Sequence, residues 1–182
     1  MKKRTLIVVS LLMATSLVAK VINHESEGNL KSDTPVKLSG VKEITSQHNP
    51  VDLFQLVRTL IEQKKYDEGA VAYFVAMAYG FYDTLRVEDN SAHQAIIVLR
   101  MDASDEFSES QINDFQSSIT KLLENEKRIL DELNKIGKPS YHPKYMIQHG
   151  MGAFTGNKSK DGLIPDFDSD KAWKEVLAGF SE

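Results

Sequence analysis

Two histidines in the C-terminal third, His142 and His149, are the side chains with the most versatile chemistry. Imidazole serves as a metal ligand and as a general acid or base. Zinc-binding histidines on one helix are three or four residues apart with a third donor nearby, and a spacing of seven does not fit. We therefore predict no metal, no cofactor and no catalytic residue, and expect both rings to hydrogen-bond the backbone around a short helix. The alternative is a hydrolase that pairs one histidine with a carboxylate such as Asp166.

Residues 152–159, Gly-Ala-Phe-Thr-Gly-Asn-Lys-Ser, superficially match a phosphate-binding loop. That loop needs four residues between its glycines and a Gly-Lys pair. Here only three residues separate the glycines, Asn157 precedes the lysine, and no apolar strand comes before the segment. We exclude nucleotide binding and expect Gly150 and Gly152 to permit a tight backbone path beneath Phe154.

Charged residues concentrate at the end of a predicted helix, where Asp83, Glu88 and Asp89 lie near Arg86. An ion pair among them would tie the helix end to the following loop, which is a structural role. The chain has no cysteine, which excludes thiol catalysis, cysteine zinc sites and disulfides.

The elements that must position these groups are helices, because apolar residues recur at spacings of three and four. We predict a single all-α bundle of about five helices over 50–182, with a Gly/Pro-rich irregular segment before the last helix. The expected helices cover about 50–65, 67–86, a stretch from Ser91 through Leu99, 109–136 and 173–180. Between Gly69 and Tyr82 no residue is charged, which predicts the buried centre of the bundle.

The longest expected helix, over 109–136, begins with a capping box formed by Ser108 and Gln111. Its apolar stripe alternates at three and four residues, which favours coiled-coil-like packing against a neighbouring helix. Glu126 is the one charged residue in that stripe, and it either meets solvent or serves as a buried polar or partner-binding group.

The irregular segment over 138–168 is rich in aromatic and methionine side chains, which anchor protein interfaces. We predict a partner-binding surface there, although the same residues could instead cover the end of the bundle. The candidate residues are Tyr141, His142, Tyr145, Met146, His149, Met151 and Phe154.

The N-terminus has the build of a secretory signal peptide over 1–19. A basic start is followed by an uncharged apolar run and small residues, with cleavage expected after Ser16 or Ala19. The run is too short to span a bilayer comfortably, which favours a cleaved signal peptide. The alternative is an uncleaved N-terminal anchor. The polar, aperiodic stretch over 20–49 predicts a flexible leader. These features indicate a bacterial periplasmic protein.

Removal of three basic residues with the signal takes the formal net charge from −4 to −7. Nucleic acids and anionic lipid surfaces favour basic patches, so neither is an expected partner. We expect no stable membrane span after cleavage, and another protein as the partner.

The first helix pair resembles one unit of a tetratricopeptide-type repeat. The matching residues are Leu53, Leu56, Gly69, Tyr73 and Ala76, and the departures are Val57, Leu60 and Phe81. One unit cannot form an array, since a solenoid needs about three. The resemblance implies a helix hairpin with a concave groove.

In compartment, size and helix layout, the chain resembles the small, cysteine-free helical immunity proteins that bacteria export against wall-attacking toxins. The resemblance implies a non-catalytic, acidic inhibitor that plugs the active-site cleft of a toxin. The alternatives are an envelope hydrolase acting on peptidoglycan and a structural adaptor of an envelope assembly.

Overall fold

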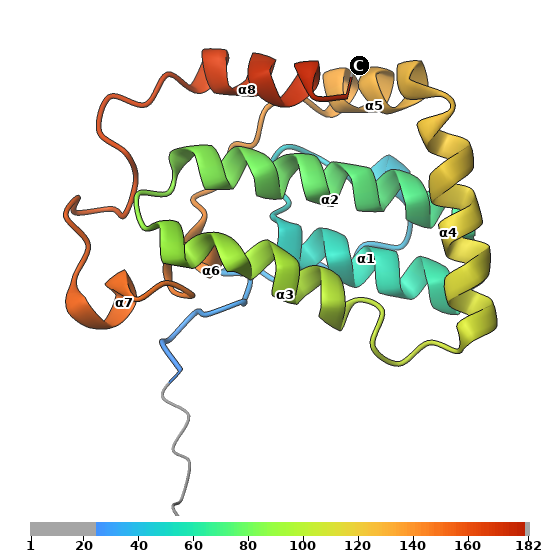
Figure 1. Cartoon of the computed structure of the whole chain (residues 1–182), viewed down its shortest axis with the longest axis horizontal. Helices are drawn as coiled ribbons and strands as arrows, with labels where there is room; N and C mark the ends of the chain where they lie inside the picture. Colours follow the sequence, from blue (N-terminus) through green and yellow to red (C-terminus); the bar gives the residue numbers. More distant parts are fainter. Residues whose placement is uncertain (1–24, 181–182) are drawn as a thin grey trace, which may run out of the picture.

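The computed structural model describes residues 25–180, so the predicted signal peptide lies outside the described residues. Within them the chain forms eight α-helices, two short 3-10 helices and no sheet, which confirms the all-α fold class (Figure 1). Six helices have at least eight residues: α1 (Pro50–Glu62), α2 (Tyr66–Arg86), α3 (Ala95–Asp102), α4 (Glu109–Leu123), α5 (Glu126–Ile136) and α8 (Ser169–Ala178). The short ones are α6 (Lys144–Ile147), α7 (Gly152–Thr155), η1 (Val41–Glu43) and η2 (Asn90–Gln94).

Helices α1 and α2 form the predicted hairpin. Asn49 caps α1 by accepting hydrogen bonds from the amides of Val51 and Asp52, and Pro50 occupies the first helical position, where a missing N–H costs nothing. The turn between the helices passes through Lys64, which has a φ of 58°. Because the turn is so short, the two apolar faces pack directly on each other.

Helix α2 is the centre of the bundle, as its uncharged sequence predicts. It contacts α1, α3, α4, α5 and α8. Its small residues allow close approach: a Cβ at Gly80 would lie 2.3 Å from the Ile96 side chain of α3. Only one side is partly open, where Tyr73 and Met77 are half-buried and Phe81 is exposed.

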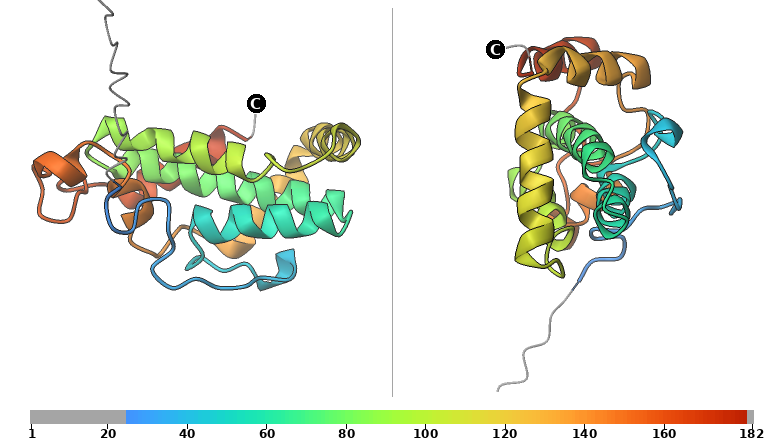
Figure 2. Two further views of the ribbon diagram at one scale, coloured as in Figure 1. Left: turned by 90° about the horizontal axis from the view of Figure 1, so that it is seen from below. Right: turned by 90° about the vertical axis from the view of Figure 1, so that its right-hand side faces the viewer.

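The predicted single helix over 109–136 is wrong, because the chain turns at Glu124–Asn125 and divides it into α4 and α5. The Asn125 side chain accepts the amide of Arg128 and so starts a new helix. Figures 1 and 2 show α4 running across the end of the α1–α2 pair, with α5 turned back alongside α2. Coiled-coil-like packing along the whole stripe is therefore also wrong. Glu126 lies exposed in the first turn of α5.

The segment over 25–49, which we call the strap, differs from the flexible leader that its composition predicts. Leu38 and Ile44 are buried in the core. The Ser32 hydroxyl donates to Asp52 of α1 at 3.0 Å, and the Leu30 amide donates to the Tyr145 carbonyl at 3.2 Å. Sparse apolar residues thus suffice to dock the strap, because side-chain and backbone hydrogen bonds hold it at intervals.

The irregular segment over 138–168 returns to the end of α2 through one antiparallel bridge between Val87 and Leu163. The Ile164 amide donates to the Arg86 carbonyl at 2.9 Å. This contact fixes the C-terminal end of the segment that carries α6 and α7. Helix α7 lies at one extremity of the molecule (Figure 1).

Candidate functional site

The predicted partner-binding residues divide into a buried group and an exposed group. Tyr145 is 1% exposed and Met146 is 0% exposed, so neither can touch a partner in this structure. The prediction is corrected for these two residues, which belong to the core. Tyr141 is half-buried against the same core.

The buried tyrosines surround one carboxylate, Asp83 of α2. The hydroxyls of Tyr141 and Tyr145 donate to Asp83 Oδ2 at 2.8 and 2.7 Å. Arg86 Nε donates to Asp83 Oδ1 at 2.8 Å, and the Arg86 guanidinium lies between the rings of Tyr82 and Tyr141 at 5.0 and 5.1 Å from their centroids. We call Asp83, Arg86, Tyr141 and Tyr145 the buried cluster.

Burial shifts the pKa values of the acidic groups in this cluster. Burial raises the pKa of the Asp83 carboxyl, while Arg86 and the two tyrosine hydroxyls act in the opposite direction. Burial and the nearby Asp83 charge raise the pKa values of Tyr141 and Tyr145 well above the ordinary range. Because Asp83 is fully buried, the cluster offers no access to a substrate. It fastens the 141–145 segment to α2, and the sequence pattern predicts the ion pair but not its burial.

The two histidines lie apart and contact different parts of the chain. Nε2 of His142 lies 3.1 Å from the Asp161 carbonyl oxygen, and Nδ1 of His149 lies 2.9 Å from the Asn29 side-chain oxygen. The backbone contact expected for His149 is thus a side-chain contact with the strap. Asp166 is exposed, and neither ring hydrogen-bonds to it. Over residues 25–180, no three His, Cys, Asp or Glu side chains are grouped so that they could hold a metal ion.

The exposed group lies on residues 150–158, which we call the α7 platform. Met151 is 62% exposed and Phe154 is 54% exposed. Both are carried by one short helical turn at the extremity of the molecule (Figure 1). Two large apolar side chains in the same turn form a local apolar surface that a folded domain does not need for its own core.

Hydrogen bonds from the turn after α2 hold the α7 platform in place. The Gly152 amide donates to Asp89 Oδ2 at 2.6 Å, and the Met151 amide donates to the Ser91 hydroxyl at 2.8 Å. Asp89 Oδ1 in turn accepts from the Ser91 amide and hydroxyl at 2.9 and 2.6 Å. The Ser91 hydroxyl therefore supports α7. At Gly150, a Cβ would lie 2.4 Å from Asp89 Oδ2, so the contact requires glycine.

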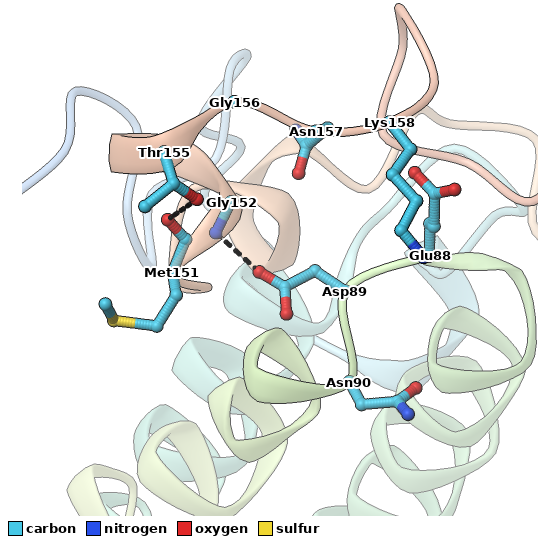
Figure 3. Close-up of a pocket in the computed structure, with 9 residues that line it drawn as sticks. All are labelled: Glu88, Asp89, Asn90, Met151, Gly152, Thr155, Gly156, Asn157 and Lys158. Carbon is cyan, nitrogen blue, oxygen red and sulfur yellow. Dashed lines mark hydrogen bonds between the residues drawn. The ribbon is translucent and has the colours of Figure 1, made fainter.

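A cavity of about 250 Å³ lies between the α7 platform and this turn (Figure 3). Its lining residues are Glu88, Asp89, Asn90, Met151, Gly152, Thr155, Gly156, Asn157 and Lys158. Glu88 Oε2 accepts the Ser159 amide at 2.9 Å. Sequence reasoning missed Glu88, Asp89 and Asn157 as site residues. Gly150 and Gly152 were the available signal. They indicate that another part of the chain lies close to the backbone, but they do not indicate which residues these are.

A larger cavity of about 560 Å³ lies between the strap and α1. Its buried carboxylate, Asp52, accepts hydrogen bonds from the Ser32 hydroxyl and from the Val36 amide, at 3.0 and 3.4 Å. Burial raises the pKa of Asp52, and these two bonds act against that rise. Because both bonds hold the strap on α1, the structural role explains Asp52 without a ligand.

Comparison with known proteins finds no match among family models, curated sequences or solved structures. Over residues 25–180, none of the helices combines the length and apolar character that crossing a membrane would require. Of the predicted partner-binding residues, only His142, Met151 and Phe154 are exposed, and the last two lie on the α7 platform. The chemistry of the α7 platform is therefore the basis for a functional assignment.

Proposed function

We propose that this protein is an exported, non-catalytic binding protein whose α7 platform engages another protein, as an immunity protein that inhibits a wall-attacking toxin. The observation that carries the proposal is the exposure of Met151 and Phe154 on a turn that is fixed to the rest of the fold. Methionine and aromatic side chains are the residues that interfaces favour as anchors.

The fixed backbone matters because ordering a loop on binding reduces affinity. Here the Gly152 and Met151 amides are already hydrogen-bonded to Asp89 and Ser91 in the free chain. The backbone that carries the two anchors is thus already ordered in the free chain, so binding a partner does not have to order it.

Charge and compartment support the same proposal. The signal-like N-terminus favours export, and the chain without its three basic N-terminal residues has a formal charge of −7. An acidic protein of this kind suits a basic protein partner better than nucleic acid or an anionic membrane. The hydrolase alternative requires His142 or His149 to work with a carboxylate, and each ring has a separate structural partner.

The test uses the chain from residue 20 and purified peptidoglycan sacculi digested by a muramidase, an amidase or an endopeptidase. We expect the chain to inhibit one of these classes at equimolar ratio, measured as released soluble fragments. Met151→Ala and Phe154→Ala should each weaken inhibition by roughly tenfold or more, because an interface anchor contributes about 2 kcal/mol. Leu123→Ala is the matched control, since Leu123 is 49% exposed on α4, far from the α7 platform.

Each variant is first checked for an unchanged free energy of unfolding, so that a loss of inhibition reports the surface. If none of the three enzyme classes is inhibited, the immunity function is wrong. If the chain alone releases fragments and His142→Ala or His149→Ala abolishes that release, the hydrolase alternative replaces it.

A further inference from the structure

The cavity beside Met151 carries more negative than positive groups. Glu88 and Asp89 line it from one side, and Lys158 is its one cationic lining residue. Over residues 25–180 neither carboxylate has a salt-bridge partner. Their hydrogen-bond donors are the amides and hydroxyls of Ser91 and Ser159 and the amide of Gly152. The cavity thus has a net charge of −1, and no cation among residues 25–180 pairs directly with either carboxylate.

Asp89 is held in its ionised form. Partial burial opposes ionisation, but the hydrogen bonds from Ser91 and from the Gly152 amide lower the pKa of Asp89 overall. Because these bonds also fix the carboxylate in space, its charge is presented in one position, as Figure 3 shows.

The cavity is open because residue 152 is glycine. A Cβ there would collide with the side-chain oxygen of Asn157 and lie 3.0 Å from Asp89 Oδ2. The oxygens of Asp89, Asn157 and Thr155 all border the same space (Figure 3). Such a surface of acceptors suits a group that has several N–H donors and a positive charge.

The apolar side chains stand next to this acceptor surface. Met151 lines the cavity and is 62% exposed, and Phe154 lies one helical turn along α7. A partner would therefore meet a cavity of net negative charge and an apolar rim at the same place. Interfaces of high specificity combine such an anchoring pocket with surrounding contacts that exclude water.

We propose that the α7 platform binds a protein surface on which an arginine stands among apolar side chains, and that its guanidinium enters the cavity between Glu88–Asn90 and Gly152–Lys158. This inference rests on the proposed function and names the chemistry of the partner. Charge complementarity favours a basic group, and the planar guanidinium offers five N–H donors to the oxygens that border the cavity.

The test uses N-acetylarginine methylamide as the probe and N-acetylcitrulline methylamide as its uncharged isostere. Both are titrated into the ¹⁵N-labelled chain from residue 20, and amide chemical shifts are followed. We expect the arginine probe to shift the amides of Gly152, Asn157 and Lys158 saturably. The citrulline probe should bind about fivefold more weakly, the effect of a favourable partly exposed ion pair, and salt should reduce the difference.

Two variants with opposite expected effects sharpen the test. Glu88→Gln removes one charge and keeps an oxygen that accepts from Ser159, so it should weaken the arginine probe by about threefold to fivefold. Lys158→Met removes the competing cation and should strengthen binding by a similar factor. Equal affinity for arginine and citrulline, or shifts confined to other parts of the chain, would overturn the inference.

Failure of this inference differs from failure of the proposed function. If Met151→Ala and Phe154→Ala abolish inhibition while the two probes bind equally, the binding function stands and the arginine pocket is wrong. If the arginine probe binds selectively but no wall hydrolase is inhibited, the arginine pocket stands and the immunity function is wrong.

Discussion

Replacing Asp83 by alanine should destabilise the fold strongly, because Asp83 is the shared acceptor of the buried cluster. The change leaves the guanidinium of Arg86, a residue that is 8% exposed, without its anion. It also leaves the hydroxyls of Tyr141 and Tyr145 without their acceptor. Breaking a buried ion pair from one side costs about 3–5 kcal/mol. Because a small domain is stable by only about 5–15 kcal/mol, this loss is a large fraction of the total.

Urea titration of the chain from residue 20 measures the effect. Trp173 is a suitable fluorescence reporter, because its ring packs edge-on against Tyr79 and Tyr82 at centroid distances of 5.9 Å. Tyr145→Phe removes one hydroxyl only and should cost about 1.5–3 kcal/mol, the range for hydrogen bonds to charged groups.

A double variant separates the destabilisation caused by the unpaired Arg86 charge from the destabilisation caused by lost packing. Asp83→Ala combined with Arg86→Met removes both charges and should be more stable than Asp83→Ala alone, since no unpaired guanidinium remains buried. A loss below about 1 kcal/mol for Asp83→Ala would refute the reasoning, because it would mean that solvent or another group satisfies Arg86. Equal stability of the single and double variants would refute the coupling.

Three further predictions concern the core, pH and export. Phe74→Ala should lower the free energy of unfolding by about 3–5 kcal/mol in urea, because the buried ring contacts Tyr73 and Phe180, and a loss below about 1 kcal/mol would contradict its burial. Burial lowers the pKa of His149 below the ordinary histidine value of 6.5, so around and just below this pH the folded state binds fewer protons than the unfolded state. Stability should therefore fall as pH drops through 6.5, and the fall should be smaller in His149→Gln. Intact mass of the periplasmic fraction should show a chain that begins at Leu17 or Lys20, and recovery of the uncleaved chain from membranes would contradict export by cleavage.

The sequence by itself determined the local elements. The Asn49-Pro50 start of α1, the capping box of Ser108 and Gln111 at α4, and the uncharged stretch in α2 all form as predicted. These signals succeed because capping bonds and helical periodicity act between residues two to four positions apart, and the physics that they report is complete within one element.

The tertiary structure decided which of these surfaces meet and which remain exposed. The apolar stripe over 109–136 indicates a buried helix face but does not predict the turn at Asn125. That turn depends on how α4 and α5 each pack against α2. Likewise, Tyr145 and Met151 have the same anchor-like character in the sequence. Asp83, 62 residues away, draws Tyr145 into the core, while the bonds to Asp89 and Ser91 hold Met151 at the surface. Contacts over such separations depend on the assembled fold, so no local pattern encodes them.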